Sequence, residues 1–325
     1  MVRISVASNG TANLARKDGV YGKHNDEMHT NVRTLEVDFE LFFGIVPSNV
    51  NKSFSLTLSE QSYLPKVDNP RADWAVIAAF NSFQAYQRGQ LGKVQRFATI
   101  GTGSGTDMIA ALETFPDLEF GAMTDLHQSV VNAAKRNVLN ATEKSAPCRA
   151  VAKSIYASAG DLLLPLSGQE AFDLIYESLV DGQMSSTFIG DRTADRVPAH
   201  VSEALLDLHY ICLYQARVTR LIKPSGAILS SMGGRVPVQS MLDMADAAGY
   251  SGRVVSLAWK IQSEPETVIS EYAENQRKGS GKIEQNLHHH RLDAEAALEQ
   301  HYAGIEIGHT VYVMASVLKG ASNFV

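Results

Sequence analysis

Arg96-Phe-Ala-Thr-Ile-Gly-Thr-Gly-Ser-Gly-Thr-Asp107 is the stretch that decides the fold of this 325-residue chain. An apolar strand leads directly into three glycines at alternate positions, and the residues that follow, up to Phe115, have apolar side chains at helical spacing. Glycine suits such a turn because it tolerates positive φ and lets a ligand approach the backbone closely. Strand, glycine loop and helix together predict a nucleotide-binding site.

The spacing of the glycines distinguishes between nucleotide cofactors. A dinucleotide-binding fingerprint has glycine at its first, third and sixth positions, whereas here Thr106 holds the sixth position and the third glycine is Gly105. The resulting GxGxG pattern resembles the first motif of class I S-adenosylmethionine-dependent methyltransferases, and the resemblance extends over about residues 93 to 320. It implies an enzyme of this class with S-adenosyl-L-methionine as its cofactor.

Later segments resemble further elements of the family in the expected order. The strand 118–124 ends in Asp125, where the family places a carboxylate that accepts both ribose hydroxyls. The next helix opens at Leu126 and His127, and His127 could either touch the adenosine or cap that helix. Asp161 stands where the family has an aspartate that, with the neighbouring amide, recognises the edge of the adenine.

The strand 171–179 ends beside the methyl group in this family, and 221–230 resembles the turn and buried strand that come after it. The resemblance therefore implies a cofactor site at the ends of several neighbouring strands, made up of Gly101, Thr102, Gly103, Gly105, Asp125, Leu126, His127, Asp161, Leu162, Glu177 and Ser178.

The resemblance also implies the fold class and the domain organisation. We expect an α/β, Rossmann-like sheet of seven mostly parallel strands with an antiparallel last strand beside the fifth. Residues 1–92 would form an N-terminal extension or lid, and residues 93–325 the methyltransferase core. A helical insertion at about 262–304 would separate strands six and seven, with helices near 264–277 and 292–302, because structureless loops of this length are uncommon. The insertion could cap the active site or form a homodimer interface.

Composition limits the partners and the compartment. The net charge of −6, without a basic cluster, argues against nucleic acid as a partner. No apolar run approaches the roughly 20 residues that span a bilayer, and residues 1–17 lack the apolar block of a secretory signal, so we expect a cytoplasmic protein without a membrane partner. Cys148 and Cys212 are far apart in sequence and are expected to be free thiols.

The extension is predicted to end in a helix at about residues 70–88. Asn69 and Pro70 read as its N-cap and first helical residue. An aromatic and aliphatic stripe follows at nearly every third position, and it could either line a substrate pocket or pack against the sheet; its members are Trp74, Ile77, Phe80, Phe83 and Tyr86.

Two histidine-containing groups could be mistaken for metal sites. Adjacent residues of a helix point about 100° apart, so the three histidines of 288–290 cannot all face one ion. His24, Asp26, Glu27 and His29 could converge on a metal or a polar substrate, or form a solvated loop. No metal is predicted for either group.

Methyl transfer is an in-line displacement, in which the protein mainly holds the acceptor against the methyl carbon and excludes water. Where the acceptor must lose a proton, a general base contributes on the order of 10² to 10⁴ in rate. The candidates near the methyl position are Tyr176, Glu177 and Asp181, together with His24 if the extension folds over as a lid. Glu177 could equally cap a loop.

The residues at the end of the strand 171–179 bear on the chemical class of the acceptor. Relatives that methylate glutamine amides or adenine amino groups have Asn/Asp-Pro-Pro-Tyr/Phe there, whereas this chain has Ser178, Leu179, Val180 and Asp181. Methylation of a planar amide is therefore disfavoured. We expect a small-molecule acceptor of specialised, biosynthetic metabolism; the alternatives are a protein or RNA methyltransferase with a decayed motif, and a non-catalytic scaffold that binds the cofactor.

Overall fold

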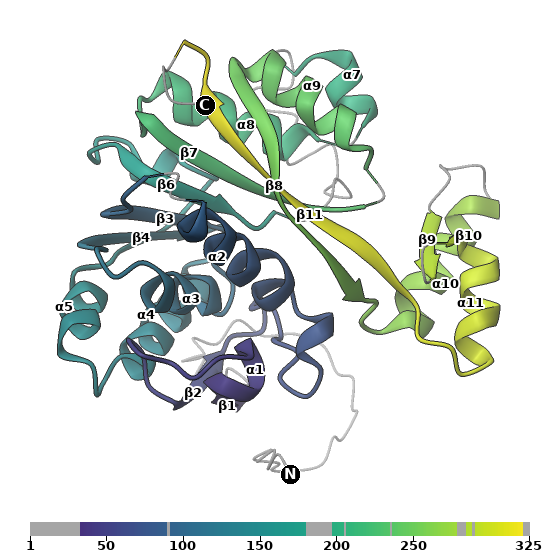
Figure 1. Ribbon diagram of the computed structural model, residues 1–325, viewed down its shortest axis with the longest axis horizontal. Helices are drawn as coiled ribbons and strands as arrows, with labels where there is room; N and C mark the ends of the chain where they lie inside the picture. Colours follow the sequence, from purple (N-terminus) through teal and green to yellow (C-terminus); the bar gives the residue numbers. More distant parts are fainter. Residues whose placement is uncertain are drawn as a thin grey trace, which may run out of the picture.

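The computed structural model describes residues 33–89, 92–179, 197–204, 206–234, 236–277, 284–287 and 290–320 (Figure 1). Helices cover both faces of a nine-stranded sheet. His24, Asp26, Glu27, His29, Asp181 and the first two histidines of 288–290 lie outside the described residues, so the predictions made for them stay predictions.

Seven strands of the sheet form the arrangement expected from the sequence. Five are parallel, and the last strand of the chain runs antiparallel to its neighbours on both sides. The predicted fold class is confirmed. In spatial order these strands are β5 (Tyr156–Ala159), β4 (Phe120–Asp125), β3 (Arg96–Ile100), β6 (Phe172–Glu177), β7 (Ile222–Gly233), β11 (Gly308–Leu318) and β8 (Tyr250–Ile261).

Two apolar clusters lie on opposite faces of this sheet, because its strands are buried on both sides and successive side chains alternate between them. One face packs against α3 (Thr106–Thr114), α4 (Gln128–Ala141) and α5 (Ala146–Ser154). All nine residues of α3 are buried. The other face packs against η3 (Leu164–Leu166), α7 (Ala199–Glu203), α8 (Asp207–Val218) and α9 (Val238–Ala248). Each cluster contains one of the two free cysteines.

The N-terminal extension is anchored on the core by buried polar contacts. It begins with β1 (Arg33–Asp38), α1 (Phe39–Phe43) and β2 (Ser53–Leu58), the two strands pairing antiparallel. The Glu113 carboxylate on α3 accepts three successive backbone N–H groups, from Ser48, Asn49 and Val50, at 2.7, 2.8 and 3.1 Å. Charge-assisted bonds of this kind fix the loop before β2 against α3.

Asn137 on α4 joins β2 to the glycine loop. Its side-chain NH₂ donates to the carbonyls of Thr57 and Ser104, both at 2.9 Å, and its oxygen accepts the amide of Thr57 at 2.7 Å. Asn140, one turn later, makes a single bond to β2, to the carbonyl of Ser55, at an exposed position.

Replacing Asn137 by alanine is expected to lower the free energy of unfolding by about 2 to 4 kcal/mol, because one buried and two partly buried backbone groups lose their partner at once. Asn140→Ala is the matched control, and its expected cost is about 1 kcal/mol or less. Urea unfolding followed by circular dichroism measures both. Equal losses for the two variants would show that the Asn137 bonds do not hold the extension in place.

The helical region after Asn69 is interrupted. A single turn, η1 (Pro70–Ala72), is followed by an extended residue, Asp73, and then by η2 (Ala75–Phe80), a π-helical stretch that continues into α2 (Asn81–Arg88). The side chain of Asn69 makes no capping bond. Asp73 caps the main helix instead, accepting the amide of Ala75 at 2.8 Å.

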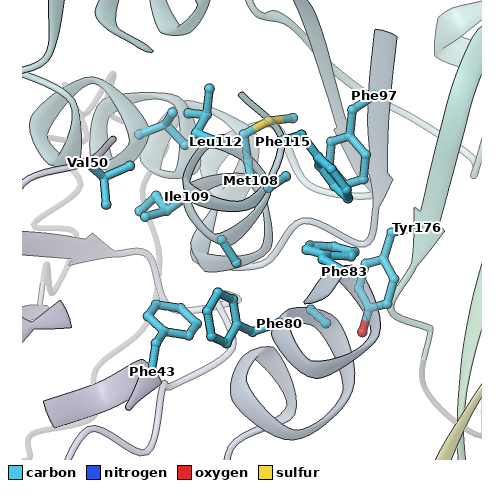
Figure 2. Packing of buried hydrophobic residues seen from close by; sticks show 14 of the residues in the cluster. Phe43, Val50, Phe80, Phe83, Phe97, Met108, Ile109, Leu112, Phe115 and Tyr176 are labelled. Atoms are coloured by element: carbon cyan, nitrogen blue, oxygen red, sulfur yellow. The ribbon is translucent and has the colours of Figure 1, made fainter. Parts of the chain in front are cut away.

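The aromatic stripe of this helix is mostly a packing surface. Phe83 lies edge-on to Phe97 and to Tyr176, with ring centroids 5.3 and 5.1 Å apart, and packs at 5.6 Å from Phe115 (Figure 2). Trp74 is the exception, because it is only partly buried and lies next to polar side chains of β8 and β11.

The insertion before the last strand contains the two expected helices, α10 (Pro265–Arg277) and α11 (Ala294–Tyr302). They pack on a small apolar cluster of their own, formed by Ile269, Ala273, Ala294, Ala297 and Ile307. A short antiparallel hairpin lies between them, β9 (Glu284–Leu287) and β10 (His290–Asp293), and it extends the sheet to nine strands. The sequence did not indicate this hairpin, because its strands have only four residues each.

Candidate cofactor and active site

The glycine loop follows β3 as the sequence predicts. Gly101, Gly103 and Gly105 have φ values of 72°, 51° and 84°, a region that side chains rarely adopt. The amides of Gly101 and Thr102 donate to the carbonyl of Thr124 at 2.9 and 3.0 Å, which ties the loop to the end of β4. Gly105 then precedes the first turn of α3.

Close packing also requires these glycines. A Cβ on Gly101 would lie 2.5 Å from the carbonyl oxygen of Ser178, and one on Gly105 would lie 2.9 Å from the carbonyl oxygen of Ala134. At Gly103 the nearest atom would be the Cβ of Tyr63, at 3.3 Å. The extension therefore passes directly against the middle of the loop.

The Asp125 carboxylate, at the end of β4, is linked to the loop. One oxygen accepts the amide of Gly103 at 3.1 Å, and the other accepts the amide of His127 at 3.4 Å. Asp125 is half-buried, whereas Leu126 and His127 are exposed. The His127 side chain makes no capping bond to α4, and its contact with adenosine stays a prediction.

The turn after β5 brings the third predicted segment to the same edge. The amide of Gly160 donates to the carbonyl of Asp125 at 2.9 Å. Leu162 has a φ of 47°, and its carbonyl accepts the Thr124 hydroxyl at 2.8 Å. Asp161 and Leu162 are half-buried, so this turn lies beside Asp125 with part of its surface open.

The end of β6 closes the other side of the loop, since the amide of Ser178 donates to the carbonyl of Ile100 at 2.9 Å. Tyr176 and Glu177, both predicted catalytic residues, are fully buried and point to opposite faces of the sheet. Glu177 contacts His209 of α8, with 2.8 Å between its Oε1 and the ring Nδ1. The two side chains therefore do not meet at one point, and their catalytic roles stay predictions.

A row of buried polar side chains, which the sequence analysis missed, crosses the sheet at this edge. Three lie near the carboxyl ends of parallel strands and two on the antiparallel strands β11 and β8, and the strand registers place all of them on the face covered by α3 and η2. The members of this polar row are Thr99, Tyr176, Ser231, His309 and Lys260.

Two buried acids face the polar row. Asp73 accepts bonds from the amide of Lys66 at 2.7 Å, the amide of Ala75 at 2.8 Å and the hydroxyl of Tyr63 at 3.2 Å. Burial raises its pKa. Burial, and next the charge of Asp73, raise the pKa of Asp107 on α3 to about 8.

The remaining predictions concern metals and membranes. Within the described ranges, no three His, Cys, Asp or Glu side chains are placed to hold a metal ion together. Among the described helices, none combines the length and the apolar character needed to cross a membrane.

Comparisons with known proteins add structures but no sequence relatives. No family model matches the chain, and no curated protein matches it in sequence. Similar solved structures include a precorrin-6y C5,15-methyltransferase from Geobacter metallireducens, at 11% identity and a TM-score of 0.40, covering 81% of this chain and 94% of that one. A ribosomal-protein methylase from Lactobacillus delbrueckii subsp. bulgaricus has 14% identity and a TM-score of 0.32, covering 71% and 75%.

A third similar structure is the N,N-8-amino-8-demethyl-D-riboflavin dimethyltransferase from Streptomyces davawensis, at 14% identity and a TM-score of 0.35, covering 55% of this chain and 51% of that one. Such values say nothing about the acceptor of this chain. The strand order, the antiparallel β11 beside β7 and the glycine loop between β3 and α3 are its own features. With these features, the chain has the Rossmann-like fold that its sequence predicts.

Proposed function

We propose that the protein transfers the methyl group of S-adenosyl-L-methionine to a small-molecule acceptor. The observation that carries this proposal is the glycine loop, with positive φ at three alternate positions and no space for a Cβ at Gly101 or Gly105. Gly101 and Gly103 are only half-buried, so part of the loop backbone is accessible. Asp125 and the turn at Asp161 stand beside it at the same sheet edge.

The residues fit the cofactor. The backbone of Gly101 to Gly105 would hold the aminoacyl part, the half-buried Asp125 would accept ribose hydroxyls, and Asp161 with the amide of Leu162 would face the adenine. When bound, the cofactor supplies an electrophilic methyl group on a sulfonium. The chain's own contribution is to orient the acceptor and to exclude water.

A small acceptor is supported by the way the extension covers the loop. Tyr63 lies against Gly103, and its hydroxyl donates to Asp73, whose bonds to Lys66 and Ala75 fix the same segment. The side chains gathered at this edge include the two acids Asp73 and Asp107, which do not suit a phosphate backbone. Trp74 packs against both His309 and Lys260 and adds an aromatic side chain to this edge.

Of the proposed catalytic residues, Tyr176 lies on the covered face with the polar row, whereas Glu177 faces α8. Tyr176 would therefore be the one of the two that contacts an acceptor directly, and Glu177 would act through its position at the end of β6. His24 would join them only as part of a lid. The cytoplasmic location and a homodimer belong to the same proposal.

Binding of S-adenosyl-L-homocysteine, measured by calorimetry, tests the cofactor. The wild-type protein should bind it. Asp125→Ala should weaken binding by about tenfold or more, because the variant lacks the carboxylate that would make two charge-assisted bonds to the ribose. Asp117→Ala is the control, because its side chain is half exposed and forms an ion pair with Lys93 at the surface. No binding to the wild type would overturn the proposed function.

Transfer of labelled methyl groups tests the acceptor class. Cell extract would be divided into a small-molecule fraction, RNA and protein, and each fraction incubated with the enzyme and labelled S-adenosyl-L-methionine. Label in the small-molecule fraction is the expected result. Label in RNA or protein would favour the alternative with a decayed motif, and binding without transfer to any fraction would favour the non-catalytic scaffold.

A further inference from the structure

Residues 59–73 of the extension, which we call the covering segment, lie against the glycine loop. The Tyr63 Cβ would be 3.3 Å from a Cβ placed on Gly103, and the Tyr63 hydroxyl donates to an oxygen of Asp73 at 3.2 Å. The amide of Lys66 donates to the same oxygen at 2.7 Å. One carboxylate therefore holds both Tyr63 and Lys66, so a contact made by Lys66 also affects the position of Tyr63 over the loop.

Two ion pairs join the covering segment to the insertion. The Lys66 ammonium pairs with Glu264, which is 198 residues later, and the Lys66 side chain is only 20% exposed. Arg71 pairs with Glu306, 235 residues later, with 2.9 Å between the nearest nitrogen and oxygen. Glu264 directly precedes α10, and Glu306 lies between α11 and β11. The covering segment thus contacts the glycine loop through Tyr63 and the insertion through Lys66 and Arg71.

The backbone of Glu264 provides an independent observation. Its φ of 52° lies in the left-handed region, which a residue with a side chain rarely adopts. Its carbonyl accepts the amides of Thr267 and Val268 at 3.1 and 3.0 Å, so the first turn of α10 fixes this residue. Strained residues of this kind persist only where the surrounding structure holds them, and they cluster at clamps and switches. The insertion therefore presents Glu264 at a fixed place, and Lys66 reaches it from the covering segment.

We propose that the Lys66–Glu264 and Arg71–Glu306 ion pairs fasten the covering segment to the insertion and thereby set the rate at which the cofactor enters and leaves the glycine loop. Because Tyr63 contacts the middle of the loop, exchange of a ligand there requires the covering segment to move. The proposal rests on the proposed function, and it assigns the insertion a role in cofactor exchange.

This role has a kinetic signature. The ion pairs join protein to protein and do not involve the ligand, so removing one favours the open segment equally in the free and in the bound protein. The association and dissociation rate constants of the cofactor should therefore rise by the same factor, and the dissociation constant should stay unchanged. A side chain that contacted the ligand directly would change the dissociation constant. A side chain with a purely structural role would change stability alone.

Lys66→Met removes the charge and keeps the apolar stem of the side chain. Both rate constants for S-adenosyl-L-homocysteine should rise about two- to fivefold, the range expected for the loss of one ion pair near the surface. Arg71→Met should act in the same direction. Lys93→Met is the matched control, because Lys93 forms a surface ion pair with Asp117 near the start of β3, at the end of that strand away from the loop.

Charge reversal tests the pairing itself. Lys66→Glu should accelerate exchange of S-adenosyl-L-homocysteine at least as much as Lys66→Met, and adding Glu264→Lys should return both rate constants towards the wild-type values. Stopped-flow fluorescence measures the rates, and calorimetry measures the dissociation constant. Hydrogen exchange of the amides of residues 59–66 in the free protein provides a measurement that needs no ligand, and it should be faster in Lys66→Met than in Lys93→Met.

Unchanged rate constants in Lys66→Met and Lys66→Glu, or a change in only one of the two, would overturn the proposal. The same holds if Glu264→Lys fails to restore the rates of Lys66→Glu. Failure of the wild type to bind S-adenosyl-L-homocysteine would instead contradict the proposed function. Hydrogen exchange would then decide separately whether the ion pairs fasten the covering segment, since equal exchange in Lys66→Met and Lys93→Met would show that they do not.

Discussion

Replacement of Gly101 by alanine is expected to reduce the affinity for S-adenosyl-L-homocysteine by about 100-fold or more. The new Cβ would lie 2.5 Å from the carbonyl oxygen of Ser178, which is backbone and cannot rotate away. The strand ends of β3 and β6 would have to separate, although the amide of Ser178 donates to Ile100 at that point. The loop between them would lose the shape that a ligand requires.

Gly44→Ala is the matched control for this prediction. Gly44 has a φ of 79°, close to the 72° of Gly101, but no heavy atom lies within 4 Å of its Cβ position. Both variants bear the backbone cost of a left-handed residue, about 1 to 2 kcal/mol, and only Gly101→Ala adds the clash. Calorimetry and urea unfolding measure the two effects. Similar affinities for the two variants would show that the packing at Gly101 does not shape the binding loop.

The parts of the fold that the sequence predicts well are those specified by local patterns. Examples are the glycine loop, the strand ending in Asp125 and the order of the later strands. Each depends on a few neighbouring residues whose types favour a particular backbone conformation. The two helices of the insertion could be placed for the same reason, from their length and the strands that bound them.

The parts that the sequence does not predict depend on contacts between distant segments. Asn137 meets Thr57 across 80 residues, and Glu113 meets the amides of the loop before β2 across more than 60. Nothing in the residues around either position marks it as a buried anchor. The position of the helix cap also depends on the folded structure. Asp73 is buried and accepts three hydrogen bonds, whereas the side chain of Asn69 makes no capping bond.

The candidate site likewise contains some residues that the sequence indicates and others that only the structure reveals. The residues proposed to hold the cofactor lie in motifs, whereas Thr99 and Asp107 flank the glycine loop and stand out only because they are buried. Tyr176 and Glu177 were predicted together as neighbours in sequence. The alternation of a strand sends them to opposite faces, so adjacency along β6 means separation in space.

Asp107→Asn is expected to change how stability depends on pH. The folded pKa of Asp107, about 8, lies above the ordinary value of 3.8, so the folded state binds a proton that the unfolded state releases between these values. The resulting stabilisation is complete below about pH 4 and is lost as the pH rises towards 8 and above. In this window the wild type should lose up to about 1.4 kcal/mol per pH unit relative to the variant.

Urea unfolding between pH 5 and 8 measures this difference, and the variant should be the more stable protein at the upper end. The charged groups around Asp107 set the direction: Asp73 opposes its ionisation, Lys260 acts on Asp73 rather than on Asp107, and Tyr63 and Tyr176 stay neutral. Asp117→Asn, at the surface, should leave the slope as it is in the wild type. Parallel slopes for Asp107→Asn and the wild type would mean that the carboxyl is not kept neutral by burial. A steeper decline of wild-type stability with pH would show that the protein loses stability at neutral pH by keeping a buried acid beside the glycine loop. Such a loss of stability is typical of functional residues.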